Sequence, residues 1–429
     1  MLNGAKHKIN SFLFNHSKRV GLNLPYFAGN GFWVALRYAV LAVTGLAVSV
    51  IFTKLGTKDL LGQYQFVLSF LSVVSLLALP GLNVAALKSV SQNQDAAVIK
   101  AVKLSFLASL AGVPIITGYG IYEIIVKSQF ILGWAFVLSG IMFPFFYAPN
   151  TWYVYFEGKS LFKAVSFRTI AINLVSSMAI ILGLFWRINL PGLVVIYLLS
   201  NAVLHGVFYL EVVKKIENKN SNDIDVRYGI YVSVQKFVYG LYNNIPPLAI
   251  SFVFGFELLA VYYITYFAVG TASGLLSSLS SIYMPLLFKN IRLNYKWIVI
   301  QNVFIGVIFS IAFLIFLKFF FLFIYGEQYY ESLRLGYAIA GLLLLTPLRI
   351  FLVNYFTTQK RNGLIVTSFI LSNLLAFAVF LLSKNTGFST SVPLYLYSLQ
   401  LFIILPLLVS YFSIASRKID SIRSEITSG

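Results

Sequence analysis

Residues Gly336 to Phe356 read GYAIAGLLLLTPLRIFLVNYF, an apolar run that contains one charged side chain, Arg349. A helix of about 20 apolar residues crosses the hydrocarbon core of a bilayer, because that core is about 30 Å thick and each residue rises about 1.5 Å. A charge at that depth costs roughly 3 kcal/mol on insertion scales, so it usually faces protein or water instead of lipid. The stretch therefore predicts a membrane span whose arginine faces the inside of a helical bundle.

The rest of the chain has the same apolar character. Of its 429 residues, 59% are hydrophobic and 10% are charged, compared with about 25% charged in an ordinary soluble domain. Windows of spanning length predict an all-α integral membrane protein with about twelve transmembrane helices. Their expected limits are 33–53, 64–87, 104–122, 131–153, 164–186, 191–210, 237–254, 259–287, 297–317, 335–357, 363–383 and 392–415.

The formal charge of +19 is explained by membrane topology. No globular segment is present to carry a basic face, so nucleic acid is not an expected partner. Of the 32 lysine and arginine residues, 23 fall in the two termini and the even-numbered loops, and seven fall in the odd-numbered loops. Cytoplasmic loops carry the excess of Lys and Arg, so both termini are predicted to be cytoplasmic.

The expected spans divide into two halves. We predict a basic cytoplasmic N-terminal segment, a first lobe of six spans, a cytoplasmic linker, a second lobe of six spans and a cytoplasmic tail, at 1–32, 33–213, 214–232, 233–415 and 416–429. A weak echo relates the halves, because Gly56 to Tyr64 after span 1 resembles Gly255 to Tyr262 after span 7. Transporters are often built from such repeats, with the substrate site at their junction.

Several short motifs occur in a defined order along the chain. They are KLGTKDLLGQY at 54–64, PGLN at 80–83, YFEGK at 155–159 and YGEQYYES at 325–332. In order and spacing the chain resembles the bacterial polysaccharide flippases (O-antigen, Wzx type) of the multidrug/oligosaccharidyl-lipid/polysaccharide export superfamily. None of the motifs is a catalytic signature. Glycines such as Gly56 and Gly62 also suit tight turns between helices.

The resemblance implies a MATE-like fold with two six-helix lobes around a central cavity. It implies a transporter, not an enzyme, in the bacterial inner membrane, with no cofactor. The implied substrate is an undecaprenyl-pyrophosphate-linked oligosaccharide, moved from the cytoplasmic to the periplasmic leaflet for O-antigen, lipopolysaccharide or other surface polysaccharide assembly. Membrane lipid, a polysaccharide polymerase and a chain-length regulator are the implied partners.

The acidic residues separate this hypothesis from its rivals. All thirteen Asp and Glu fall in loops or at span ends, whereas an exporter of organic cations is expected to hold a carboxylate in its membrane cavity. A polysaccharide polymerase is expected to carry a large periplasmic loop, but the largest loop here is predicted to be cytoplasmic. A flippase for the peptidoglycan precursor stays open as an alternative.

Three cations are the candidate substrate-binding residues. Arg349 lies about eight residues, or ~12 Å, from the cytoplasmic end of its span, Arg37 lies about four residues in, and Lys236 lies at the mouth of span 7. An arginine fork binds phosphate oxygens bidentately and stays protonated, which suits a pyrophosphate. Arg37 could instead reach the headgroups, and Lys236 could be interfacial.

Uncharged residues of the spans supply further candidates. Two prolines in span 7 are expected to break that helix. The break could be a gate or a plain kink, and its residues are Asn243, Asn244, Pro246 and Pro247. Pro347 is expected to bend span 10 just before Arg349. His205 could be a proton site or make an ordinary interhelical hydrogen bond. The three histidines are too dispersed for a metal cluster, and no phosphate-binding P-loop occurs.

Overall fold

The computed structural model describes residues 24–217, 224–288, 295–359 and 361–428, and these residues form helices and turns with no strand among them. The first half of the chain contains α2 (Leu24–Leu55), α3 (Lys58–Val74), α4 (Leu82–Ser91), α5 (Ala97–Ser109), α6 (Gly112–Ile125), α7 (Phe130–Tyr147), α8 (Tyr153–Gly158), α9 (Phe162–Phe185) and α10 (Leu190–Lys215). The second half contains α11 (Val226–Phe254), α12 (Phe256–Phe288), α13 (Tyr295–Phe316), α14 (Leu322–Tyr325), α15 (Tyr330–Ile339), α16 (Leu342–Thr358), α17 (Asn362–Ser383) and α18 (Phe388–Ser428).

The predicted all-α membrane architecture is confirmed, because helices occupy each of the expected spans. Within the described residues, nine helical stretches are long and apolar enough to cross a membrane, and the bent pair Glu327–Ile339 and Leu342–Thr358 makes ten. Helices α11 and α12 occupy expected spans 7 and 8 and have 29 and 33 residues, but they are not among these ten. Helix α11 lines a cavity described below, and Asn243, Asn244, Pro246 and Pro247 lower its apolar content.

Expected spans 2 and 10 are among those that are interrupted. Span 2 ends at Leu79, whose φ of 57° is left-handed, and α4 starts a separate helix at Leu82. Pro80 explains this break, because proline disfavours helical geometry in the residue before it. Span 10 bends by 54° between Ile339 and Leu342, several residues before Pro347, which lies inside α16. The bend therefore differs in position from the one predicted at Pro347.

The predicted break at Pro246 and Pro247 was wrong, because α11 is a single helix through both prolines. Each proline removes one backbone N–H and so leaves a carbonyl one turn earlier without its helical partner. Such carbonyls are tolerated where the helix faces protein or a water-filled space. Asn243, Asn244 and Pro247 line the central cavity described below, so this stretch of α11 meets that condition.

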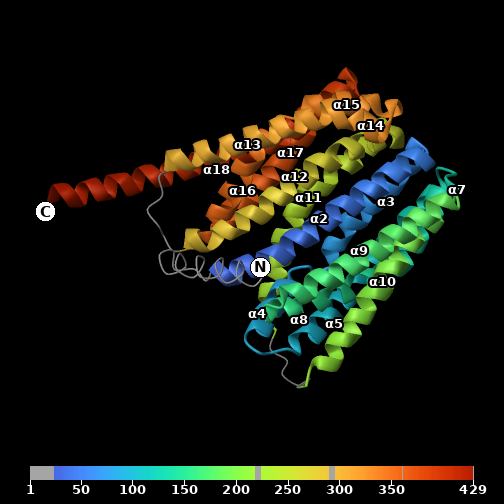
Figure 1. Ribbon diagram of the computed structural model, residues 1–429, viewed down its shortest axis with the longest axis horizontal. Helices are drawn as coiled ribbons and strands as arrows, with labels where there is room; N and C mark the ends of the chain where they lie inside the picture. Colours follow the sequence, from blue (N-terminus) through green and yellow to red (C-terminus); the bar gives the residue numbers. More distant parts are fainter. Residues whose placement is uncertain (1–23, 218–223, 289–294, 360, 429) are drawn as a thin grey trace, which may run out of the picture.

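The helices form two groups in chain order (Figure 1). In the first group, α2–α10, α2 packs on α9, and α10 packs on both α7 and α9. In the second group, α11–α18, α16 packs on α12 and α13, and α17 packs on α18. The groups meet where α3 packs on α11 and α12. Residues 218–223 between α10 and α11 lie outside the described residues, so the exact lobe and linker limits stay a prediction.

Gly62 lies at a close backbone contact between the two groups. A Cβ built on Gly62 would lie 1.8 Å from the backbone oxygen of Phe256, so α3 and α12 touch through their backbones. Nearby, the Tyr325 and Ser49 hydroxyls lie 3.1 Å apart, and Gln328 Nε2 donates to Thr53 O over 2.6 Å. Gly62 is thus a packing glycine inside α3, not the turn residue that the sequence suggested.

Candidate functional site

A cavity lies at the meeting of the two groups, here called the central cavity, and has a volume of about 400 Å³. Helices α2, α3, α11 and α12 supply its walls. The aromatic lining consists of Tyr38, Tyr262, Tyr263, Tyr266 and Phe267, and the polar lining consists of Gln65, Ser69, Asn243, Asn244 and Thr271. Gly270 and Gly274 line the same wall of α12, where the lack of side chains leaves room for a ligand.

The chemistry of the central cavity is uncharged, since no Asp, Glu, Lys, Arg or His belongs to its described lining. The rings of Tyr262 and Tyr266 stack one helical turn apart, with centroids 5.1 Å from each other. Flat aromatic faces offer apolar surface with a hydroxyl at the edge, and amide side chains both donate and accept hydrogen bonds. The cavity is therefore suited to a neutral, hydroxyl-rich ligand.

Arg349 lies in the second group, outside the central cavity. Its guanidinium carbon is 4.9 Å from the ring centre of Tyr242, and its buried Nε has no hydrogen-bond partner. The space beside it is only about 10 Å³, roughly enough for one water molecule. Tyr266 lines both this space and the central cavity, so its side chain is part of a shared wall.

Arg37 faces a different space, a cavity of about 370 Å³ lined by residues of the first group. We call it the first-group cavity; its polar lining includes Arg37, Tyr153, Glu157, Asn173, Asn201 and His205. Arg37 Nη1 lies 3.8 Å from Glu157 Oε1. The expectation that no acid would face the interior was wrong for Glu157, because α8 directs this span-end residue into the cavity.

His205 takes the hydrogen-bonding role that the sequence left as an alternative. Its Nδ1 accepts a hydrogen bond from Trp152 Nε1 over 3.0 Å, and the side chain is 8% exposed. Because Nδ1 accepts, Nε2 carries the proton of the neutral ring. His205 also lines the first-group cavity, so its Nε2–H is a donor available there.

The structure does not bring the three candidate cations together. Lys236 Nζ donates to Pro80 O over 3.1 Å and so ties α11 to the break after α3. Arg37 lies in the first-group cavity and Arg349 in the second group. Among the described residues, Arg349 forms no ion pair.

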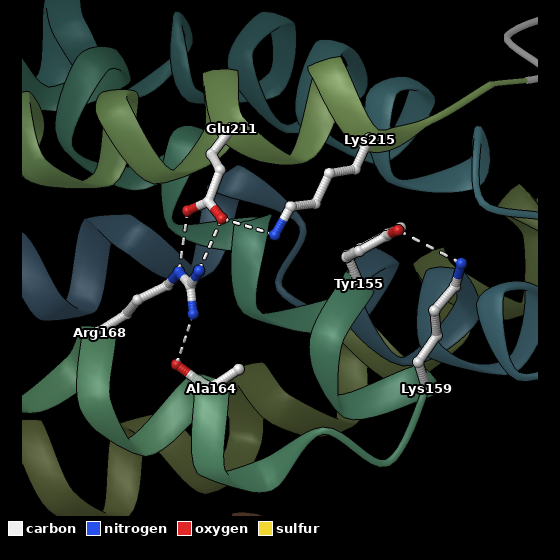
Figure 2. Close-up of polar contacts among 6 residues, drawn as sticks. All are labelled: Tyr155, Lys159, Ala164, Arg168, Glu211 and Lys215. Carbon is white, nitrogen blue, oxygen red and sulfur yellow. Dashed lines mark hydrogen bonds and ion pairs between the residues drawn. The ribbon is translucent and has the colours of Figure 1, made fainter.

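A charged cluster connects α9 and α10 (Figure 2). Arg168 of α9 makes two hydrogen bonds to Glu211 of α10, at 3.0 Å and 2.6 Å, and Lys215 donates to the same carboxylate over 2.7 Å. The Arg168 guanidinium carbon also lies 4.3 Å from the ring centre of Phe156 on α8. The cluster fixes α8, and with it Glu157, against α9 and α10.

Sequence reasoning missed the aromatic wall of the central cavity and the polar side chains of the first-group cavity. Tyr262 and Tyr266 are one helical turn apart, a spacing that puts them on one face of a helix. That spacing was a usable signal. Asn201 and Glu157 carried no such signal in the sequence, because they line the same cavity only through the packing of the helices that contain them.

The chain matches no protein-family model, and no curated protein matches it. Its fold is similar to solved membrane transporters. An inward-facing MATE-family multidrug resistance transporter of the MOP superfamily superposes with a TM-score of 0.66 at 12% identity, covering 90% of this chain and 96% of that one. The lipid II flippase MurJ, in an inward closed conformation, gives 0.60 at 11% identity, covering 88% and 86%. A Vibrio cholerae MATE transporter gives 0.59 at 10% identity, covering 92% and 98%. The chain therefore has the MATE-like fold.

Proposed function

We propose that this protein is a flippase that moves polyprenyl-pyrophosphate-linked oligosaccharides from the cytoplasmic to the periplasmic leaflet of the bacterial inner membrane. The uncharged central cavity, with its tyrosine faces and amide groups, is the observation that carries the proposal. Sugars present hydroxyls that both donate and accept hydrogen bonds, and C–H faces that pack on aromatic rings. The assembly of O-antigen or another surface polysaccharide is the process that needs this transport.

The rival function of multidrug export fits the charges less well. A cationic drug needs a carboxylate in its cavity, and the described lining of the central cavity contains none. Glu157 lines the first-group cavity, but Arg37 is paired with it and neutralises its charge. The similarity in fold to MATE transporters shows architecture and leaves the substrate to be decided by the cavity.

We assign the pyrophosphate of the carrier to Arg349. In this structure the small space beside Arg349 has no room for a pyrophosphate, so the group would reach the guanidinium only after Tyr242 or Tyr266 moves. A buried guanidinium without an acidic partner favours an anionic ligand. Asn243, Asn244, Pro246 and Pro247 of α11 are the residues we propose to accompany this movement as a gate, because three of the four line the cavity.

Deletion of the gene tests the proposed function. We expect undecaprenyl-linked repeat units to accumulate on the cytoplasmic face and the surface polysaccharide to disappear, with both restored by the wild-type gene. Surface polysaccharide that persists in a strain without a redundant flippase would contradict the proposal. Sensitivity to cationic drugs as the sole defect would favour multidrug export. Rescue of a strain depleted of its peptidoglycan-precursor flippase would favour that alternative.

The predicted orientation has a direct test, because the chain contains no cysteine. Ser128 and Ser160 are exposed turn residues with similar backbone angles, φ 55° and 58°, so Ser128→Cys and Ser160→Cys form a matched pair. With both termini cytoplasmic, Ser128 is periplasmic and Ser160 cytoplasmic. A membrane-impermeant maleimide should label only the first variant in spheroplasts. Labelling of Ser160→Cys alone would reverse the orientation.

A further inference from the structure

The first-group cavity contains hydrogen-bonding groups that the surrounding protein leaves unused. Asn201 Nδ2 donates to Tyr197 O over 2.8 Å, which leaves its carbonyl oxygen as an acceptor. His205 accepts from Trp152 at Nδ1, which leaves Nε2–H as a donor. Asn173 contacts the Thr44 hydroxyl through one end of its side-chain amide, which leaves the other end available for a hydrogen bond. The free groups thus comprise both donors and acceptors.

The charged pair in the same cavity is loose. The Arg37 to Glu157 distance of 3.8 Å is longer than a hydrogen bond, whereas Arg168 and Glu211 approach to 2.6 Å in the neighbouring cluster. The two side chains are 17% and 23% exposed, so their remaining donors and acceptors are available to a ligand. Because the pair is neutral as a whole, it does not select for an anion or a cation.

The size of the cavity and its position also point to a ligand. Its volume of about 370 Å³ lies within the ~300–1,000 Å³ of typical small-molecule sites. Leu41 of α2 lines both this cavity and the central cavity, so the two spaces are neighbours. Within the second group, the space beside Arg349 is about 10 Å³ and offers no equivalent room.

We propose that the first-group cavity is a separate sugar subsite that binds one neutral sugar unit through Arg37, Glu157, Asn173, Asn201 and His205. Each sugar hydroxyl can donate one hydrogen bond and accept others, which matches a lining that mixes unused donors and acceptors around a neutral ion pair. The proposal rests on the proposed function for the claim that the bound sugar belongs to the transported glycan. The binding of sugar itself is tested independently of the proposed function.

Ligand-observed NMR on the full-length protein tests the subsite. Saturation transfer would be measured in lipid nanodiscs, which avoid sugar-based detergents, with free neutral hexoses and N-acetylhexosamines. In a separate arm the ³¹P line width of sodium pyrophosphate would be measured, because this anion has no carbon-bound proton to observe. We expect neutral sugars to bind and Asn201→Leu to weaken the binding about tenfold, the equivalent of one good hydrogen bond. Asn302→Leu is the matched control, because Asn302 makes the same bond to the carbonyl four residues earlier, at 2.9 Å, on α13.

Three results would overturn the subsite. These are no saturation transfer from any neutral sugar, equal weakening by Asn201→Leu and Asn302→Leu, and a pyrophosphate signal that Arg37→Gln removes while neutral sugars give none. The outcome is separable from the function test. Sugar binding that depends on Asn201, in a protein whose deletion leaves the surface polysaccharide intact, would retain the subsite and reject the flippase. If deletion gives the phenotype of a flippase but sugar binding does not depend on Asn201, the proposed function is retained and the subsite is rejected.

Discussion

The internal arginines of the two helix groups differ in their ion pairing and in the space beside them. Arg37 of the first group faces a cavity of about 370 Å³ and is paired with Glu157. Arg349 of the second group stacks on Tyr242 beside about 10 Å³ of free space and has no ion pair with the described residues. The difference teaches that an intramembrane charge by itself does not mark a ligand site. The space beside the charge and the partner it already has decide what it can bind.

The two groups are held together at Gly62, and Gly62→Ala should disrupt this contact. A Cβ at Gly62 would lie 1.8 Å from Phe256 O, so α3 and α12 must separate, at a cost of about 3 kcal/mol or more. We expect a large drop in melting temperature and loss of transport. Gly118→Ala in α6 is the control, because a Cβ there has no neighbour within 4 Å. Equal stability of the two variants would contradict the close contact.

Transport assays on variants of Arg349 should sharpen the comparison. If Arg349 is the residue that meets the pyrophosphate, Arg349→Met should slow transport tenfold or more, since hydrogen bonds to charged groups contribute roughly 1.5–3 kcal/mol. Arg349→Lys should retain part of the activity, because it keeps the charge and loses the planar fork. The measurement is the amount of lipid-linked repeat unit on the cytoplasmic face at matched expression. Full activity of Arg349→Met would remove Arg349 from the mechanism.

Stability measurements should show that Arg37 and Glu157 of the first group are energetically coupled. Arg37→Gln leaves Glu157 as an unpaired, partly buried charge, so we expect a loss of roughly 1–2 kcal/mol, between the values for exposed and buried ion pairs. The double variant Arg37→Gln/Glu157→Gln should recover most of this loss in thermal unfolding. No equivalent rescue is expected for Arg349. Additive effects of the two substitutions would show that the pair is not coupled.

The all-α membrane fold could be predicted because hydrocarbon thickness sets a length that apolar windows reveal directly. The break after Leu79 could have been predicted from Pro80. The contact at Gly62 could not, because a glycine inside a helix carries no local sign of the backbone that packs against it.

The candidate site was predictable in part. The sequence showed that Arg349 is deep, but its surroundings come from Tyr242 and Tyr266 on other helices. Glu157 appeared to be a span-end residue, and only the packing of α8 on α4 and α9 directs it into a cavity. Depth in a span is a local property of the sequence, whereas the space beside a side chain is set by distant segments.

The position of Leu41 on the boundary of both large cavities has a mechanical consequence. A movement of α2 at Leu41 changes the volumes of both cavities. A displacement of α2 toward α9 would shrink the first-group cavity and widen the central one, and the reverse displacement would do the opposite. Occupancy of one chamber would thereby set the capacity of the other, with no contact between the two ligands.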